Sequence, residues 1–257
     1  MKFTHYMAAG HRSNCRGYYN HAMHIVGPFR QIRAAVMVPA ALASACAPYG
    51  RIQPPDHYVT LQQGIATYYD ADGSGACLFG PSPKDLMVAA MNADEYGNST
   101  ACGAYIRVTG PKGAVIVRIA DLCPECRAGH LDLSREAFGL IADMAQGRVP
   151  ITWQVLSPDL AGPIAYHFKN GSNQWWTAVQ VRNHRNPVAR LEYLTTDGHW
   201  QSVPRTAYNY FVQTRPAMGP GPYTFRVTDI FGSVLVDHSV LHRESGTVDG
   251  AGQFPPP

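Results

Sequence analysis

Apolar and polar residues alternate in several short segments of the first half of the chain, the pattern of a strand with one buried face. Strands are predicted at residues 64–69 and 149–156. Residues 104–109 (AYIRVT) and 114–120 (AVIVRIA) flank the tight turn Gly110-Pro-Lys-Gly113. This arrangement predicts a β-hairpin.

One helical pattern follows the hairpin. Ser134 is suited to cap the start of a helix, and residues 135–144 carry apolar side chains at helical spacing. These positions are Ala137, Leu140, Ile141 and Met144. We therefore expect a short helix with one apolar face.

The second half of the chain has little helical periodicity and is rich in turns. Strands are predicted at residues 164–168, 177–181, 188–194, 224–227 and 234–238. Turns such as Lys169-Asn-Gly171 and Thr196-Asp-Gly198 separate them. Five or more short strands in so short a stretch favour a β-sandwich.

The composition supports a mainly β protein, because 24 Gly and 20 Pro accompany only 15% charged residues. The Pro- and Gly-containing segment 157–163 is the best domain boundary. We expect a first domain at 56–156, a second at 158–245 and a C-terminal tail at 246–257. Within that tail, Phe254 either packs against the second domain or is loose.

The first 47 residues have the features of an export leader. Arg30 and Arg33 precede the uncharged run 34–45, which ends in small residues. Cleavage is expected after Ala43-Ser44-Ala45, or after Ala45-Cys46-Ala47, and Met23 is an alternative start. The run is shorter than the ~20 residues of a membrane span. We therefore expect a secreted protein, with lipidation at Cys46 as the alternative.

Removing the leader changes the charge balance. It contains five of the 21 Lys and Arg residues and none of the 18 Asp and Glu residues, which leaves 16 basic against 18 acidic residues. The sequence pI near 8.5 therefore gives no reason to expect a nucleic-acid partner. We expect a monomer that contacts no membrane unless Cys46 is lipidated.

Four cysteines follow the leader, namely Cys77, Cys102, Cys123 and Cys126. Disulfides are the default in an exported chain, and four cysteines allow three connectivities. We favour Cys77–Cys102 and Cys123–Cys126. One alternative is a zinc site that includes His130, and another is a redox Cys-x-x-Cys. The predicted helix begins only after Ser134, which disfavours the redox alternative.

Two aspartates flank that Cys-x-x-Cys in the segment DLCPECRAGHLDLS, residues 121–134. An acid and a second carboxylate on either side of a sugar bond can catalyse its hydrolysis. Asp121 ends an apolar strand and Asp132 lies just before the helix cap. The alternative interpretation is structural, with Asp121 fixing the loop and Asp132 bonding backbone amides near the helix start.

Trp175 and Trp176 stand together at the start of a predicted strand. Alternation would put one in the core and one on the surface. A bulge or the strand entry would instead place both on one face, as an apolar strip suited to sugar rings. Tyr208 could extend this strip, and Lys169 could bond hydroxyls at its edge.

The chain resembles the bacterial expansins over residues 57–256. The first half carries the resemblance in GIATYY (64–69), GAYIRVTGPKG (103–113) and DLCPECRAGHLDLS. The second half carries it in GSNQWWTAVQVRNHRNPV (171–188), AYNYFV (207–212) and the tail Gln253-Phe-Pro. The resemblance implies a mainly β fold, a six-stranded double-psi β-barrel followed by an immunoglobulin-like β-sandwich that binds cellulose.

The resemblance also implies roles for single residues. Thr67, Asp121 and Asp132 match the polar groove of the barrel, and Asp132 matches the general acid of related hydrolases. The cellulose platform is matched by Trp175, Trp176, Tyr208 and Lys169. Cys123 stands where many members have an aromatic residue, so we expect Tyr69 or Tyr105 to supply that contact.

The function implied is loosening of plant cell walls through cellulose and matrix polysaccharides, without hydrolysis, metal or cofactor. Two alternatives stay open. The first is a weak glycoside hydrolase or lytic transglycosylase on β-1,4-glucan or peptidoglycan. The second is a purely wall-binding protein.

Overall fold

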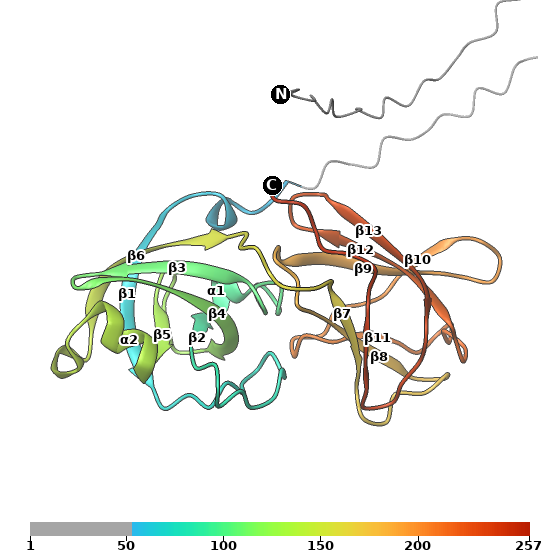
Figure 1. Cartoon of the computed structure of the whole chain (residues 1–257), viewed down its shortest axis with the longest axis horizontal. Helices are drawn as coiled ribbons and strands as arrows, with labels where there is room; N and C mark the ends of the chain where they lie inside the picture. Colours follow the sequence, from blue (N-terminus) through green and yellow to red (C-terminus); the bar gives the residue numbers. More distant parts are fainter. Residues whose placement is uncertain (1–52) are drawn as a thin grey trace, which may run out of the picture. The chain divides into compact units, whose positions relative to one another are not determined.

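Six strands close into a barrel in the first half of the computed structural model, which describes residues 53–257. Their order around the barrel is β1-β5-β2-β4-β3-β6, with β1 parallel to β5 and β2 parallel to β4 (Figure 1). The strands are β1 (Gln62–Tyr69), β2 (Val88–Asn92), β3 (Tyr105–Gly110), β4 (Gly113–Cys123), β5 (Leu131–Ser134) and β6 (Val149–Leu156).

The predicted hairpin and helix are present. β3 and β4 pair antiparallel through the turn at Gly110 and Gly113. Ser134 Oγ accepts the Ala137 N–H at 3.1 Å and caps α2 (Arg135–Ile141). The helix ends earlier than predicted because Ala142 is extended, and Met144 begins the short 3-10 helix η2 (Met144–Gln146).

The residue pattern alone did not predict β2 and β5. All five residues of β2 are buried, so its sequence VAAMN does not alternate. β5 has only four residues, too few to establish a period. Both belong to the closed barrel, and their place follows from pairing with β1 and β4. Two further short helices are η1 (Asp56–Tyr58) and α1 (Ala93–Tyr96).

The barrel core is filled by large apolar side chains. Trp153 is fully buried, and its indole Nε1 donates to the Gly129 carbonyl at 3.1 Å. α2 contributes Phe138, whose ring lies 4.9 Å from that of Tyr68. Burying one such side chain stabilises the fold by about 1.5–3 kcal/mol. Other core residues include Met91, Ile106, Ile119, Leu131 and Leu133.

The second half forms two four-stranded sheets, in the orders β10-β9-β12-β13 and β11-β8-β7-β14. Their inner faces share one apolar core that includes Tyr166, Phe168, Phe211 and Phe225. The strands are β7 (Ala165–Phe168), β8 (Thr177–Arg182), β9 (Val188–Leu194), β10 (Trp200–Ser202), β11 (Phe211–Gln213), β12 (Tyr223–Asp229), β13 (Val234–Val240) and β14 (Thr247–Asp249).

The segment 246–257 is not a tail beside the sandwich but part of it, which corrects the expected boundary at residue 245. β14 pairs antiparallel with β7 and forms an edge of the second sheet. Phe254 is 1% exposed and belongs to the sandwich core. A three-residue strand carries almost no alternation, so the sequence pattern could not reveal it.

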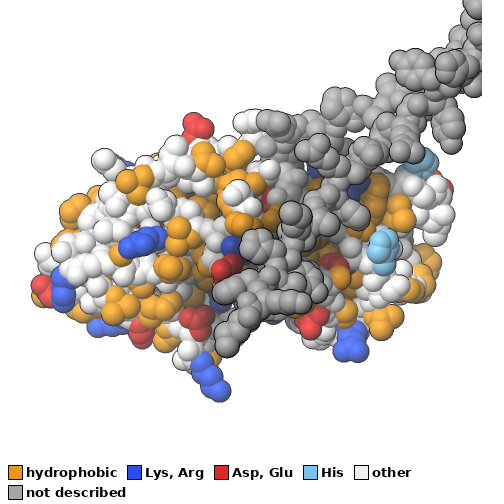
Figure 2. Space-filling view, turned by 45° about the horizontal axis from the view of Figure 1, so that its top comes forward, with side chains coloured by type: hydrophobic (Ala, Val, Ile, Leu, Met, Phe, Trp, Pro, Cys, Tyr) orange, Lys and Arg blue, Asp and Glu red, His pale blue; other side chains and the backbone are white. Residues whose placement is uncertain are grey.

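Charged side chains are scattered over the surface. In the view of Figure 2, Lys and Arg (blue) and Asp and Glu (red) lie dispersed over the described part of the protein, without a block of one sign. No helix within residues 53–257 is long and apolar enough to cross a membrane. The expected leader, residues 1–47 with Cys46, lies outside the described residues.

Two disulfides link Cys77 to Cys102 and Cys123 to Cys126, the pairing favoured from the sequence. Because the sulfurs of Cys123 and Cys126 are bonded to each other, they are not zinc-ligating thiolates. Cys77 and Cys102 are fully buried in the barrel core.

We predict that the two disulfides differ in their effect on the free energy of unfolding. The Cys77–Cys102 bond spans 25 residues and the Cys123–Cys126 bond only 3. Chain entropy alone then gives about 3.5 kcal/mol for the first and about 2 kcal/mol for the second. Urea unfolding of the two double alanine variants measures the difference. An equal or larger loss on removing Cys123 and Cys126 would contradict this assignment.

Candidate functional site

Three predicted site residues lie in one row across four neighbouring barrel strands. Thr67 on β1 is paired with Asp132 on β5, Asp132 with Ala90 on β2, and Ala90 with Asp121 on β4. The Cα atoms of the two acids are therefore two strand spacings apart, about 9.6 Å. The small side chain of Ala90 separates them. We call Thr67, Asp132, Ala90 and Asp121 the acid row.

Asp132 is hydrogen-bonded at one end of this row. Thr67 Oγ1 donates to Asp132 Oδ1 at 2.5 Å, and His130 Nε2 lies 3.0 Å from the same hydroxyl. A threonine hydroxyl has one proton to give, so His130 Nε2–H is the donor in the second contact. The three side chains form a directed chain from His130 through Thr67 to Asp132.

Burial controls the protonation of both ends of this chain. Desolvation raises the pKa of Asp132, although the Thr67 bond and His130 act in the opposite direction. Burial, together with the charge of Arg148, lowers the pKa of His130. A neutral histidine therefore faces a carboxyl that keeps its proton to a higher pH than usual. This is the electrostatic state expected of an acid that donates a proton or a hydrogen bond.

Asp121 has a different environment. Its Oδ1 accepts the backbone N–H groups of Ala76 at 2.6 Å and of Leu122 at 2.8 Å. A Cβ on Gly75 would lie 2.4 Å from the Asp121 carboxyl carbon, so only glycine permits this close approach. Asp121 fixes the loop before Cys77, and not chiefly the loop between the two acids that the structural interpretation named, and one of its oxygens is already occupied.

Tyr69 faces the acid row and Tyr105 does not. The Tyr69 hydroxyl is buried, with no hydrogen-bond partner among the described residues. Burial and then the charges of Asp121 and Asp132 raise its pKa, and Tyr69 follows Thr67 by two residues on β1, which puts both on one face of the strand. Tyr105 is instead the strand partner of Arg118 and lines a separate pocket. Of the two tyrosines named for the contact at Cys123, only Tyr69 lies on a strand of the acid row, and its role in binding stays a prediction.

Three other loop carboxylates near the barrel have partners of their own. Asp72 Oδ1 accepts from the Ser74 hydroxyl and N–H, which lowers the Asp72 pKa. Glu95 is buried and accepts the Gly129 N–H at 3.1 Å and the Asn92 side-chain amide. Asp70 is exposed, 3.6 Å from Arg135. Each is committed to a local structural contact.

Sequence reasoning missed the residues that position His130. A Cβ on Gly64 would lie 1.8 Å from the Gly129 carbonyl oxygen, so two glycines let the disulfide loop contact β1 directly. Glu95 holds the Gly129 N–H, and Asn92 Nδ2 donates to the His130 carbonyl at 3.2 Å. The Gly-His pair before Asp132 was a visible signal, but its contact with Thr67 depends on long-range packing.

The two tryptophans of the second half are both outside the core. Trp175 is 70% exposed and Trp176 is half-buried. They lie in a turn, where Asn173 Oδ1 accepts the N–H of Trp175 at 2.9 Å and of Trp176 at 3.1 Å. Strand alternation therefore does not apply, and the expectation of one core tryptophan is wrong.

The other two residues predicted to bind cellulose, Lys169 and Tyr208, lie next to strands of one sheet. Lys169 follows β7, the tryptophan turn precedes β8, and Tyr208 precedes β11. The Lys169 Nζ lies 5.5 Å from the ring centroid of Tyr210, and the Tyr208 ring lies 6.1 Å from that of Tyr210. Tyr210 thus connects Lys169 with Tyr208. We call Trp175, Trp176, Tyr208 and Lys169 the aromatic platform.

One short segment joins the acid row to the sheet that carries the platform. Ala76 donates its N–H to Asp121, and the next carbonyl, that of Cys77, accepts from Gln180 at 2.8 Å and from Asn209 at 3.3 Å. Gln180 is on β8 and Asn209 follows Tyr208. A continuous path of bonded residues therefore runs from Asp121 to Tyr208.

We predict that the Thr67 hydroxyl lowers the pKa of Asp132. Thr67→Val removes a bond to the ionised carboxylate while keeping the volume, so the Asp132 pKa should rise further. Thr67→Ser keeps the hydroxyl and should leave it near the wild-type value. A carbon-13 titration of the Asp132 carboxyl measures both. Identical titration of the two variants would contradict the assigned bond.

Comparison with known proteins gives consistent matches. A family model described as lytic transglycolase matches residues 61–153. Expansin-YoaJ of Bacillus subtilis (strain 168) is 41% identical over 208 residues, which are 77% of this chain and 88% of that protein. Expansin-like protein 1 of Dictyostelium discoideum is 28% identical over 66% of this chain and 63% of that protein.

Solved structures agree with the sequence matches. The apo expansin of Clavibacter michiganensis superimposes with a TM-score of 0.71 at 35% identity, covering 77% of this chain and 99% of that one. An aspartate-to-asparagine mutant of the same expansin, in complex with cellohexaose, gives a TM-score of 0.72 at 35% identity and the same coverage. The barrel, the sandwich and these matches together show that the chain belongs to the expansin family.

Proposed function

We propose that this chain binds cellulose and related cell-wall glucans and loosens the wall without cutting glycosidic bonds. The observation that carries the proposal is the unequal state of the two acids in the row. Asp132 has a raised pKa and a single side-chain donor, whereas Asp121 is bonded to two backbone amides. The family relatives, one of them solved with cellohexaose, support glucan as the ligand.

Hydrolysis needs two carboxylates acting on the two sides of one bond. Asp132 fits the acid, but the candidate bases Asp70, Asp72 and Glu95 have other partners, and one Asp121 oxygen orders a loop. A groove that can hydrogen-bond sugar hydroxyls, with these four carboxylates bonded elsewhere, favours binding over bond cleavage.

The work of loosening would then be divided between the two halves. The platform adsorbs on the apolar face of cellulose, with about 25 cal/mol for each Å² of apolar surface removed from water. Thr67 and Asp132 hydrogen-bond a single glucan in the groove, beside the ring of Tyr69. Because the platform is already bound, the groove meets that glucan at a high effective concentration. Its hydrogen bonds compete with those between glucans, so that the chains slip.

A second candidate is a weak glycoside hydrolase or lytic transglycosylase on β-1,4-glucan or peptidoglycan. Two observations favour it: the matching family model is described as lytic transglycolase, and Asp132 is an acid with a raised pKa. Only an enzyme releases reducing ends or muropeptides. Release by the wild type that is abolished in Asp132→Asn would therefore indicate this second candidate.

We also propose the setting in which the protein works. It is secreted by the leader at residues 1–47, acts as a monomer, and meets plant cellulose and matrix polysaccharides outside the cell, where it takes part in plant–microbe interaction. The two disulfides support an oxidising compartment.

We predict that Asp132→Asn abolishes most of the extension of cellulosic walls under constant load. The variant replaces one carboxyl oxygen, which can accept from a glucan hydroxyl, by an amide group that only donates, at a cost of about 1–3 kcal/mol, so activity should fall about tenfold or more. Asp143→Asn, an exposed acid paired with Lys112, is the control and should extend walls normally. Wall-loosening that survives Asp132→Asn, or reducing ends released by the wild type, would contradict the proposal.

We predict that Trp175→Ala combined with Trp176→Ala removes most cellulose binding. Each indole face contributes about 2 kcal/mol of apolar burial, so the pair should weaken binding by about two orders of magnitude or more. A pull-down with crystalline cellulose measures this. Leu241→Ala, which removes an exposed apolar side chain of the same domain, is the matched control. Unchanged adsorption of the double variant would refute the platform.

A further inference from the structure

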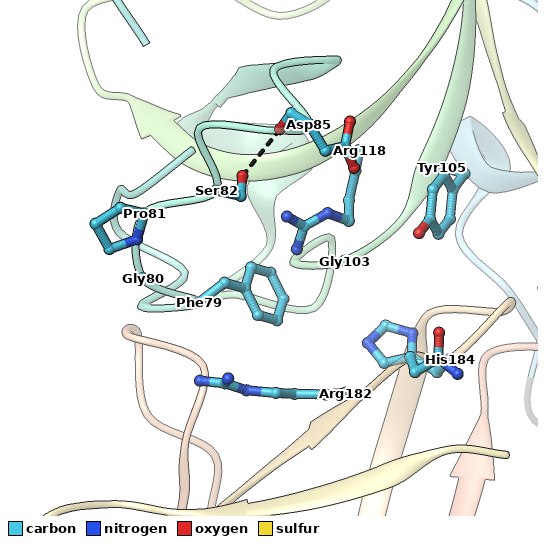
Figure 3. Close-up of a pocket in the computed structure, with 11 residues that line it drawn as sticks. Phe79, Gly80, Pro81, Ser82, Asp85, Gly103, Tyr105, Arg118, Arg182 and His184 are labelled. Atoms are coloured by element: carbon cyan, nitrogen blue, oxygen red, sulfur yellow. Dashed lines mark hydrogen bonds between the residues drawn. The ribbon is translucent and has the colours of Figure 1, made fainter. Parts of the chain in front are cut away.

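A small pocket lies between the barrel and the sandwich, apart from both the acid row and the platform. Its volume is about 290 Å³, near the lower end of ligand pockets, which are about 300–1,000 Å³. The barrel lines it with Phe79, Asp85, Tyr105 and Arg118, and the sandwich with Arg182 and His184 (Figure 3).

Two guanidinium groups enter this pocket around one ring. In Figure 3 the Phe79 ring lies between Arg118 and Arg182, and the guanidinium carbons are 4.6 and 5.9 Å from the ring centroid. The ring holds the two like charges in place through cation–π contacts. Two guanidinium groups lining one pocket give it a positive potential that attracts an anion.

Neither arginine is neutralised by a carboxylate. Across residues 53–257, neither Arg118 nor Arg182 has an acid within ion-pair distance, and no hydrogen-bond acceptor is assigned to the Arg118 guanidinium. Arg182 bonds only neutral groups, Gln180 Oε1 at 2.5 Å and the Leu78 carbonyl at 3.4 Å, besides its contact with Tyr210. Burial lowers its pKa, and the charge of Arg118 adds to the effect. A bound anion would relieve this cost.

The other polar groups of the pocket suit hydroxyls. His184 Nδ1–H donates to the Asn186 carbonyl at 2.9 Å, and burial lowers the His184 pKa to about 4. The ring is therefore neutral at mildly acidic pH, and its Nε2, beside Gly103, is an acceptor. The Tyr105 hydroxyl has no hydrogen-bond partner in the described part of the chain, so it is free to donate or accept.

Asp85 is the one acid lining the pocket. It is exposed, and its Oδ1 accepts the Met87 N–H at 3.3 Å. In Figure 3, Asp85 and Arg118 lie on the same side of the pocket. With neutral His184, the lining carries two positive charges and one negative charge. Asp85 opposes an incoming anion without blocking the two arginines.

We propose that this pocket binds the carboxylate of a sugar acid in an acidic wall polysaccharide, at a site separate from the glucan groove. Arg118 holds the carboxylate, Arg182 attracts it from the other side of the Phe79 ring, and Tyr105 and His184 bond ring hydroxyls. The volume corresponds to about ten water molecules, which is room for roughly one sugar residue. The choice of a sugar acid among carboxylates rests on the proposed wall function, whereas the anion site itself rests on the pocket alone.

Calorimetric titration of the full chain with trigalacturonate, cellotriose and inorganic sulfate tests the proposal. Trigalacturonate should bind at least tenfold more tightly than cellotriose. Arg118→Gln removes no assigned hydrogen bond. It should weaken the binding of trigalacturonate at least tenfold and leave the binding of cellohexaose unchanged. Asp85→Asn should tighten the binding of trigalacturonate several-fold, because it removes the negative charge that opposes the anion. Arg107→Gln removes an exposed charge from the same strand as Tyr105 but lines no part of the pocket, and should have no effect.

Three outcomes would overturn the proposal. Trigalacturonate that binds no better than cellotriose would exclude an acid site. Equal losses in Arg118→Gln and Arg107→Gln would indicate general charge attraction. Sulfate that binds as tightly as trigalacturonate, with the same dependence on Arg118, would indicate a simple anion site without sugar recognition. None of these results alters the cellulose pull-down, which tests the proposed function independently.

Discussion

The backbone of residues 76–78 is the constraint on which the two halves of this expansin depend. Asp121 holds the Ala76 N–H, the disulfide to Cys102 fixes Cys77 in the barrel core, and the Cys77 carbonyl accepts from Gln180 and Asn209 of the sandwich. Gln180 and Asn209 are themselves buried. Buried polar contacts of this kind are costly to break, because each separated group would lose its partner away from water. The segment therefore fixes the platform sheet relative to the acid row.

This constraint explains why Asp121 and Asp132 have different tasks although they occupy one row. Asp121 lies against Gly75 and accepts the Ala76 N–H, and so holds the segment that reaches the sandwich. Asp132 holds no backbone segment in this way, and burial raises its pKa although the Thr67 bond lowers it. A barrel related to lytic enzymes by its family model can in this way serve as a sugar-holding groove. In the proposed function, one carboxylate would meet the glucan and the other would maintain the position of the loop that contacts the sandwich.

The sequence predicted well those features that depend on neighbouring residues. The β3–β4 hairpin, the Ser134 cap and β6 at residues 149–156 follow from local patterns. Three strands show no alternation of apolar and polar residues: β2 is buried throughout, β5 has four residues and β14 has three. Their place is decided by their partners in the sheet. At the site, the resemblance identified the acids and the tryptophans. The contacts of Gly64 with Gly129, and of Cys77 with Asn209, join residues 65 and 132 positions apart, and no local pattern encodes them.

The central claim is that the acid row and the aromatic platform are held in one fixed relative orientation. Residual dipolar couplings of backbone amides in the barrel and in the sandwich measure the relative orientation of the two directly. The account predicts that a single alignment tensor fits both sets of couplings, with and without cellohexaose. Two different tensors in the free protein would show that the domains move independently, and would contradict the fixed connection through residues 76–78.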